Sequence, residues 1–482
     1  MNISLIMLNS QQDKYKESEK NLHKWNNEVD VIVLGSGFAG LAAAISAREV
    51  GASVMVLEKQ NHCGGNSLFS DGVLAIVNPN FQGENGLVDS PDLLMRDMLK
   101  AGRGYCDEKL VNILANQANE VFQWLVEDIG CCFQDRVDKF GGHSMPRSYT
   151  PCDDSGKGII KPMLAKFKSL DGKIKPNTSF REFLTNEKNE ITGVVIQSVQ
   201  QKSTLSLEYI KVRKGVVLAT GGFSGDISFR IKYDRRLNAE VDHTNIPNTT
   251  AQGMLQAVAL DAQTVNLNYI QLAPWTSPDE KSYGTAPIFA SYAVFQYGFM
   301  VDVATGKRFV NELADRKTCT DAMFELSQPS VGIADSQGVE LAGKSIKSAL
   351  RRGVVKKFET LETLAEAYNI PVKTLCETLL EYNTYVETQC DVALGKPILE
   401  GSKPLKPPFY GVRLYPKVHH TMGGLKINAD AQVLNSKEKP IKGLYAAGEV
   451  TGGVHGACRL STLAITDCLV FGRIAGRNVA KE

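Results

Sequence analysis

The sequence predicts an α/β fold in which a parallel sheet is covered by helices on both faces. Residues 29–34 form an almost unbroken run of β-branched and aliphatic side chains, as expected for a strand buried on both faces. The run leads into a glycine-rich turn and an alanine-rich helical pattern, and two later apolar runs, 215–222 and 443–448, also end in glycines. Such strand ends can meet at one edge of a parallel sheet, where these folds bind long ligands.

The first glycine-rich turn has the spacing of a dinucleotide-binding motif. Residues 35–40 read Gly-Ser-Gly-Phe-Ala-Gly, a helix is predicted over 41–50, and a second strand over 53–57 ends at Glu58. Two glycines let the backbone approach a pyrophosphate, the third lets the helix pack against the strand, and the acid accepts hydrogen bonds from a ribose. The candidate dinucleotide contacts are therefore Gly35, Gly37, Ala39, Gly40 and Glu58.

The stretch that follows favours a flavin over a nicotinamide cofactor. Residues 63–67 and 70–72 form a glycine-rich loop, where a plain dehydrogenase would start another helix and strand. Such a loop lets backbone groups reach along an extended cofactor. A helix is also expected over 460–476, with its first amides facing the electron-rich end of a reduced flavin. A Rossmann-like domain that binds FAD is the expectation.

Composition and charge exclude several classes of protein. The chain has 482 residues, a length that suggests about three structural units or two large ones. Of these residues 43% are hydrophobic, as in a globular protein. Its 54 basic and 53 acidic side chains give a formal charge of +1, so no global field favours nucleic acid or an anionic membrane. The early apolar run, 3–8, is too short for a signal or a membrane span. We expect a soluble, cytoplasmic protein with a flexible tail over 1–28.

Cysteine and histidine spacing predicts no metal site. The ten cysteines include no C-x-x-C pair, which argues against haem attachment, an iron-sulfur cluster or a zinc ribbon, and reduced thiols are expected. His419, His420 and His455 lie close in sequence. Neighbours in an extended segment point to opposite faces, and no carboxylate stands at ligand spacing, so we expect no metal.

The C-terminal part carries a long and specific resemblance. Residues 418–424, Val-His-His-Thr-Met-Gly-Gly, and the run from Ala447 to Leu460 closely resemble flavoproteins of the fumarate reductase and succinate dehydrogenase family, in particular soluble flavocytochrome c fumarate reductases and urocanate reductases. The resemblance extends from about residue 28 to the end. It implies a Rossmann-like FAD-binding domain over 29–266 and 422–482, interrupted by a smaller capping domain over 267–421 that closes over the flavin.

The resemblance also implies roles for single residues. Arg316 matches the arginine that donates a proton, and His419 and Arg459 match the pair that holds a substrate carboxylate. Ser291 and Tyr292 are further substrate-binding candidates. The residues that the resemblance matches to the FAD site are Glu58, Asn66, Ser67, Asp71, Gly72, Ala219, Glu449, Ala464 and Ile465. We add Gly221 and Gln252 as further candidates for this site.

These residue types suit reduction of a C=C bond conjugated to a carboxylate. Hydride from flavin N5 reaches the β-carbon, and negative charge then builds on the α-carbon and the carboxylate oxygens. An arginine fork and an imidazole aimed at those oxygens stabilise the charge in a closed, dry site. An arginine is a weak acid, but it can protonate a strongly basic carbanion if a relay replaces its proton.

The sequence departs from the fumarate-reducing members at the distal half of the pocket. Counting back from Gly298, Ser291 stands in place of a threonine, and Tyr292 and Phe295 replace the glutamate and arginine of the proton relay. No histidine stands near Ala273, and Trp275 follows it. A buried second carboxylate would lack partners there. A monocarboxylic enoate such as acrylate, methacrylate or an arylacrylate is therefore expected as the substrate, unless these aromatic side chains belong to the core of the cap.

A second departure from these reductases lies just before the predicted C-terminal helix. Residues 459–464 read Arg-Leu-Ser-Thr-Leu-Ala, where such reductases usually have two glycines and an asparagine after Arg-Leu.

Two alternative functions stay open. They are an FAD-dependent dehydrogenase of the 3-ketosteroid or tricarballylate type, and a non-catalytic flavin-binding protein. Arg316 could also be a solvated, salt-bridging arginine. Without a haem site or a second nucleotide fold, electrons are expected from a separate donor: a flavoprotein, a cytochrome or NAD(P)H.

Overall fold

A sheet of eight strands organises the larger of two structural units. The computed structural model describes residues 24–78, 83, 86–199 and 205–482. The strand order is β17-β18-β8-β1-β2-β5, with β7 paired to β8 and β6 to β7. The pairings among β18, β8, β1, β2 and β5 are all parallel, so the predicted α/β class is confirmed. The strands are β1 (Asn27–Leu34), β2 (Val54–Leu57), β5 (Lys173–Lys175), β6 (Thr178–Thr185), β7 (Ile191–Val199), β8 (Leu205–Leu218), β17 (Gln432–Leu434) and β18 (Pro440–Ala446).

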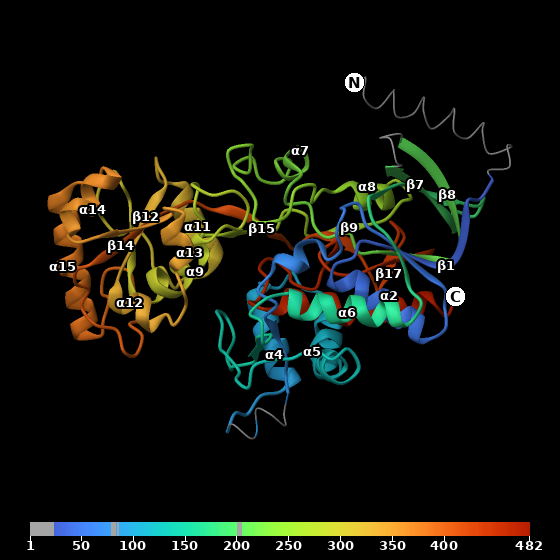
Figure 1. The fold of residues 1–482 in the computed structure, drawn as a ribbon, viewed down its shortest axis with the longest axis horizontal. Helices are drawn as coiled ribbons and strands as arrows, with labels where there is room; N and C mark the ends of the chain where they lie inside the picture. Colours follow the sequence, from blue (N-terminus) through green and yellow to red (C-terminus); the bar gives the residue numbers. More distant parts are fainter. Residues whose placement is uncertain (1–23, 79–82, 84–85, 200–204) are drawn as a thin grey trace.

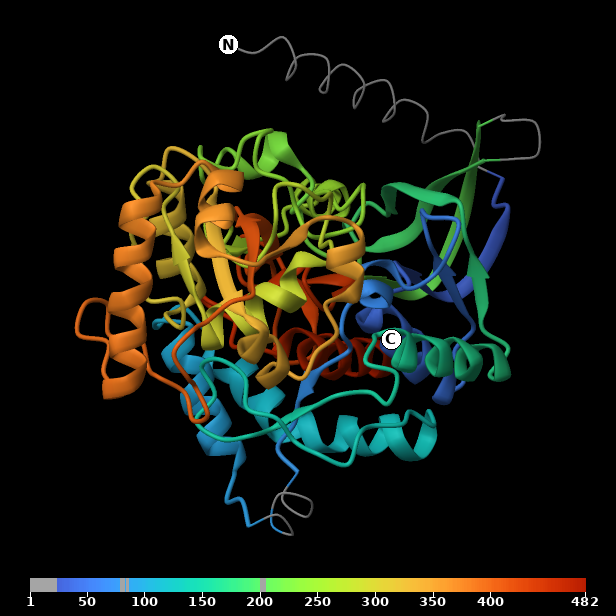
Figure 2. The ribbon, with the colours of Figure 1, turned by 60° about the vertical axis from the view of Figure 1, so that its left-hand side comes forward.

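Two helices of the larger unit, α2 and α16, pack closely on each other. A Cβ built on Gly476 of α16 would lie 2.1 Å from the Ala43 carbonyl oxygen of α2, so only glycine permits this approach. Figure 2 shows α16, in red, running through the centre of the unit, with α5 outside it. The helices are α2 (Phe38–Glu49), α4 (Pro91–Ala101), α5 (Glu108–Gln123), α6 (Lys157–Ser169), α7 (Ile227–Arg230), α8 (Gln252–Val258) and α16 (Leu463–Val479).

Several predicted boundaries need correction. The expected tail over 1–28 is too long, because β1 already begins at Asn27, where it pairs with Ile210; residues 1–23 lie outside the described part of the chain. The first helix begins at Phe38 rather than at residue 41. The C-terminal helix begins at Leu463 rather than 460, because Thr462 has a left-handed backbone, φ +60°.

The smaller unit, residues 286–414, has its own antiparallel sheet and core. Its strand order is β11-β12-β14-β13, and Phe299, Ile333 and Phe409 are buried beneath two helices. Figure 1 shows this unit on the left, with β15 running towards the larger unit. The elements are α9 (Ala286–Phe289), a π-helical turn (Ala290–Val294), α10 (Phe295–Tyr297), β11 (Phe299–Val301), α11 (Arg316–Phe324), β12 (Ser330–Asp335), α12 (Ser336–Leu341), α13 (Lys347–Arg351), β13 (Val355–Phe358), α14 (Leu361–Tyr368), α15 (Val372–Thr388) and β14 (Phe409–Leu414).

Two antiparallel strands connect the units. β10 (Ile270–Ala273) leads out of the larger unit, β15 (Lys417–Thr421) leads back, and the two strands pair with each other. Short strands complete the larger unit in two small sheets. They are β3 (Leu74–Ala75) with β4 (Ser148–Tyr149), and β9 (Thr264–Val265) with β16 (Gly424–Lys426) and β19 (Thr451–Gly452).

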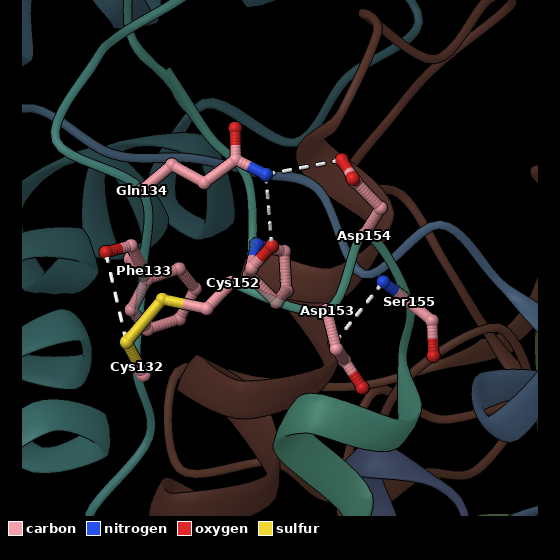
Figure 3. Close-up of a disulfide and its surroundings, with 8 residues drawn as sticks. Cys132, Phe133, Gln134, Cys152, Asp153, Asp154 and Ser155 are labelled. Atoms are coloured by element: carbon pink, nitrogen blue, oxygen red, sulfur yellow. Dashed lines mark hydrogen bonds between the residues drawn. A yellow bond between two sulfur atoms is a disulfide. The ribbon is translucent and has the colours of Figure 1, made fainter. Parts of the chain in front are cut away.

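The expectation that all cysteines are reduced thiols is wrong. Cys132 and Cys152 form a disulfide that joins two loops 20 residues apart (Figure 3). Gln134 adds to the same junction, because its amide donates to the Pro151 carbonyl at 3.2 Å and to Asp154 at 3.1 Å. No helix among the described residues is long and apolar enough to cross a membrane.

A buried ion pair in the same region should contribute strongly to stability. Arg147 is fully buried and donates to Asp89 at 2.7 Å and to Asp97 at 2.6 Å. We expect Arg147→Leu to lower the free energy of unfolding by about 3–5 kcal/mol, because it leaves two carboxylates without their cation. Urea unfolding of the FAD-loaded protein measures the change.

The matched control for this prediction is Arg136→Leu. Arg136 pairs with Asp138 at 3.3 Å, but its side chain is 52% exposed, and such pairs contribute about 1 kcal/mol or less. If both substitutions lowered the free energy of unfolding equally, burial would not decide how much an ion pair contributes to stability.

Candidate functional site

The ends of four parallel strands open on one cavity of the larger unit. Leu34 and Gly35 end β1, Leu57 and Glu58 end β2, and β8 and β18 contribute the residues just after them. Strands of a parallel sheet bind ligands at this edge. The predicted residues that line the cavity are Gly35, Gly37, Ala39, Glu58, Asn66, Ser67, Ala219, Gly221, Gln252 and Glu449.

The glycine turn has the close contacts that its motif predicts. Gly35 has φ +103°, and a Cβ there would lie 2.3 Å from the Ala219 carbonyl oxygen. A Cβ on Gly40 would lie 2.0 Å from the Gly35 carbonyl oxygen, so Gly40 allows helix packing and does not line the cavity. Gly37 stands at the start of α2 without a side-chain cap. The helix therefore offers main-chain donors to a phosphate.

The polar groups of the cavity fit an adenine dinucleotide. Glu58 is buried, and its carboxylate accepts from the Ser36 amide at 3.2 Å and the Ser36 hydroxyl at 2.5 Å. A carboxylate can accept further hydrogen bonds, and ribose hydroxyls would supply them. The Thr220 hydroxyl is buried at the same cavity and has no partner among the described residues. A cofactor hydroxyl or phosphate would satisfy it.

Sequence reasoning missed some lining residues and placed others that do not line the cavity. Ser36 lines it at a variable position of the glycine motif, and Thr178–Phe180, Ile246, Asn248–Thr250 and Cys468 line it from segments without a motif. Asp71, Gly72, Ala464 and Ile465 lie outside the lining. Their roles at the flavin stay predictions.

Arg316, the predicted proton donor, lies at the start of α11 and points towards the larger unit. Its Nη1 donates to Oε1 of Gln271 at 2.8 Å, and its Nη2 to the Ser461 hydroxyl at 3.4 Å. The guanidinium carbon lies 4.7 Å from the centre of the Trp275 ring, a cation–π distance. Asp315 caps α11 by accepting from the Lys317 and Thr318 amides, which fixes the helix start. Arg316 is therefore held by contacts rather than solvated.

His419 and Arg459, the predicted carboxylate pair, lie in the same site. His419 comes from β15, its Nδ1 lies 2.9 Å from the Thr244 hydroxyl, and its ring centre is 6.2 Å from that of Trp275. Arg459 is buried, and its Nε has no partner among the described residues. Gln271 links the arginines, because its amide nitrogen donates to the Arg459 carbonyl at 3.3 Å.

The electrostatics of this site favour an anion. Burial and the nearby Arg459 guanidinium lower the pKa of Arg316, whose guanidinium is enclosed although the residue is partly exposed. Burial and the two guanidinium groups hold the pKa of His419 well below its usual range. A bound carboxylate would relieve this crowding of positive charge, since charge-assisted pairs with arginine are strong.

The cavity and the arginine site adjoin through Glu449. This residue lines the cavity and accepts from the Thr421 amide of β15 at 2.9 Å. Burial raises the pKa of Glu449 to about 7. Thr421 lies two residues from His419, so one end of the cavity adjoins the side chains predicted to bind the substrate.

Two of the distal residues are partly exposed and the third is buried in the core. Ser291 and Tyr292 are partly exposed on the π-helical turn, and Lys344 Nζ lies 5.7 Å from the Tyr292 ring centre. Phe295 is buried in the core of the smaller unit, with its ring centre 6.5 Å from that of Trp275. For Phe295, the alternative left open by the sequence, a place in the core of the smaller unit, is therefore the one observed.

Tyr283 and Gln271 are the residues that sequence reasoning missed here. The Tyr283 ring lies 6.3 Å from that of His419, and its phenol interacts electrostatically with Arg316. Gln271 is the polar residue of the short apolar strand β10, and this was a usable signal. Tyr283 lies in a loop, and no sequence pattern marked it.

Comparisons with known proteins agree with this geometry. The model of the FAD binding domain family matches residues 30–465. The acrylate reductase flavoprotein subunit of Shewanella woodyi is 39% identical over 472 residues, which cover 94% of this chain and 92% of that protein. The urocanate reductase of Eggerthella lenta is 32% identical, over 94% of this chain and 75% of its own length.

A solved structure is similar over nearly the whole chain. The open conformation of a flavocytochrome c3 fumarate reductase superposes with a TM-score of 0.82 at 33% identity. The match covers 98% of this chain and 81% of that one.

Proposed function

The chain belongs to the FAD binding domain family, and we propose that it reduces the C=C bond of a monocarboxylic enoate such as acrylate, methacrylate or an arylacrylate. It is an FAD-dependent oxidoreductase that acts on C=C bonds. The observation that carries the proposal is the meeting of Arg316, His419 and Arg459 at the end of the FAD cavity. We further propose the domains expected above, with 267–421 as the cap.

The side chains of the site have separate tasks in this reaction. When bound, FAD supplies the two electrons as a hydride to the β-carbon of the enoate. His419 and Arg459 hold the carboxylate, and their hydrogen bonds strengthen as charge develops on its oxygens. Arg316 places an N–H at the α-carbon, and its lowered pKa makes it a better acid than a solvated arginine. Gln271 and Trp275 fix its direction.

The distal half of the site supports a monocarboxylic substrate. Ala273 is fully buried on β10, and the aromatic ring of Trp275 lies against Arg316, with the ring of Tyr283 near His419. A second carboxylate placed against these rings would cost several kcal/mol without a charged partner. A steroid would leave the unpartnered Nε of Arg459 unmatched, which disfavours the dehydrogenase alternative.

Reoxidation of the reduced flavin tests the function. The FAD-loaded protein is photoreduced without oxygen and mixed with acrylate, methacrylate, cinnamate, urocanate or fumarate, and a ketosteroid is mixed with the oxidised form. We expect a monocarboxylic enoate to reoxidise the flavin at least about 10²-fold faster than fumarate, the factor for about 3 kcal/mol. Faster reoxidation by fumarate would refute the argument from the distal residues. Reduction of the oxidised flavin by the steroid would favour the dehydrogenase.

We propose that electrons reach the flavin from a separate donor. The described residues form one nucleotide-binding sheet, so NAD(P)H, a cytochrome or a small flavoprotein would act from outside the FAD cavity. Anaerobic flavin reduction by NADH, NADPH or a reduced viologen distinguishes a direct nicotinamide donor from a protein donor.

The cytoplasmic location expected from the sequence is a further proposal, and the disulfide bears on it. Disulfides persist in oxidising compartments and are rare in a reducing cytosol. If the protein is cytoplasmic, Cys132 and Cys152 should be alkylated in a lysate quenched with acid and then treated with a thiol reagent. Protection of both thiols until a reductant is added would place the protein in an oxidising compartment.

A further inference from the structure

His419 has two ring nitrogens, and only one of them is left for a substrate. Nδ1 lies 2.9 Å from the hydroxyl oxygen of Thr244, which is a hydrogen-bond distance. Nε2 is therefore the nitrogen that can hold the carboxylate of an enoate. A carboxylate accepts hydrogen bonds and donates none, so Nε2 must carry a proton to hold it.

The ring of His419 carries one proton rather than two. Burial and the guanidinium groups of Arg316 and Arg459 hold the pKa of His419 well below its usual range, so the imidazole is neutral near pH 7. A neutral imidazole has one N–H and one bare nitrogen. When the proton is on Nε2, Nδ1 is bare and needs a donor. The Thr244 hydroxyl can be that donor, because it rotates to donate or to accept.

The backbone fixes Thr244 against the strand that carries His419. The Thr244 amide donates to the Val418 carbonyl at 2.8 Å, and the Val418 amide donates to the Asp242 carbonyl at 2.9 Å. The side-chain amide of Asn245 donates to the His419 carbonyl at 3.3 Å. This segment therefore runs alongside β15, and its backbone contacts place the hydroxyl at Nδ1 without help from a ligand.

We propose that Thr244 is a positioning residue for the reaction: its hydroxyl donates to Nδ1 of His419 and thereby keeps the ring proton on Nε2, where the substrate carboxylate accepts it. The inference rests on the proposed enoate reduction and adds the group that sets the hydrogen-bonding direction of His419. Without this donor, the ring must leave Nδ1 without a partner or move its proton to Nδ1 and turn a lone pair towards the carboxylate. Both arrangements weaken the hold on the substrate.

Two substitutions separate the hydroxyl of Thr244 from the shape of its side chain. Thr244→Val removes the hydroxyl and keeps the branched shape, whereas Thr244→Ser keeps the hydroxyl. Thr384→Val is the matched control, because Thr384 is exposed on α15 and its hydroxyl donates to the Leu380 carbonyl at 3.0 Å. All variants are loaded with FAD, and their flavin content is measured to detect misfolding.

Binding and turnover are measured for each variant. Propionate and 3-phenylpropionate, the saturated counterparts of acrylate and cinnamate, are titrated against the oxidised protein and followed by flavin absorbance. We expect Thr244→Val to weaken binding of the saturated acid, and to lower kcat/KM for the matching enoate, by at least about tenfold, because a buried hydrogen-bonding group loses its partner. Thr244→Ser should stay within about threefold of the unmodified protein, because it keeps the donor. Thr384→Val should stay within about twofold, as a surface change away from the site.

Nitrogen NMR reads the position of the proton directly. The protein is labelled with nitrogen-15 in its histidines, and the signals of His419 are those that disappear in His419→Asn. In the complex of the unmodified protein with the saturated acid, we expect the chemical shifts of a protonated Nε2 and a bare Nδ1. This readout needs no turnover, and a merely structural role of Thr244 would not predict it.

Three results would overturn the role of Thr244. They are a proton on Nδ1 or on both nitrogens in this complex, unchanged binding of the saturated acid in Thr244→Val, and failure of Thr244→Ser to keep that binding. If the unmodified protein binds the acid but no enoate reoxidises its reduced flavin, the proposed reduction is wrong, while the NMR signals still confirm or refute the position of the proton. If it binds neither acid, the carboxylate site is wrong, and both proposals fail.

Discussion

Replacing Arg316 by glutamine should lower kcat/KM for acrylate by about 10⁴-fold, while the protein still folds and binds FAD. Glutamine keeps two N–H donors near Gln271 but has no cationic acid to protonate the α-carbon, and general acids contribute about 10²–10⁴-fold. The cation–π contact with Trp275 is lost as well. Steady-state rates with reduced methyl viologen measure the effect, and flavin absorbance measures cofactor content.

Lys317→Gln is the matched control for this substitution. Lys317 is the next residue of α11, its side chain is 58% exposed, and it pairs with Asp321 at the surface. It should change kcat/KM less than about twofold, because exposed ion pairs contribute little. A loss of less than tenfold in Arg316→Gln would refute the role of Arg316 as the proton donor.

Gly35→Ala should yield a protein that no longer retains FAD. The new Cβ would lie 2.3 Å from the Ala219 carbonyl oxygen, at a φ of +103° that alanine rarely adopts. Strain and overpacking each cost roughly 1–3 kcal/mol, and both act on the turn that faces the cofactor phosphates. We expect at least a tenfold weaker affinity for FAD, measured by the flavin-to-protein absorbance ratio after gel filtration and by flavin titration.

Gly51→Ala separates backbone strain from crowding. Gly51 also has a positive φ, +90°, but a Cβ there meets nothing within 4 Å, and the residue lies away from the cavity. It should lower stability slightly and leave FAD bound. Equal FAD loss in both variants would show that backbone strain alone, rather than contact with Ala219, decides binding.

The first strand and its glycine turn could be predicted because their signals are local. The buried run before Gly35, the spacing to Gly40 and the acid at Glu58 lie within 30 residues, and the structure brings Gly35 and Glu58 to one cavity. The positions of Arg316, His419 and Arg459 followed from matched motifs. That they meet in one site is a property of the fold that no local pattern contains.

The missed features depend on contacts between distant segments. Thr178 and Phe180 line the cavity because β6 starts beside β2, and Tyr283 reaches His419 only because β10 and β15 pair. The Cys132–Cys152 disulfide has no spacing motif, so the sequence allowed many pairings among ten cysteines. The late start of α16 follows from the left-handed backbone of Thr462, which sequence patterns do not specify for threonine.

The strand order of the large sheet has a consequence for biosynthesis. β1 is made first, but its neighbour β8 starts at Leu205, and β18, on the other side of β8, starts at Pro440. A nascent chain therefore holds six of the eight strands by residue 218, but it lacks β17 and β18 until residue 446. Glu449 and α16 come later still, so the cavity lacks part of its lining until nearly the whole of this chain has been made, and the edge of β8 that pairs with β18 stays uncovered until β18 is made.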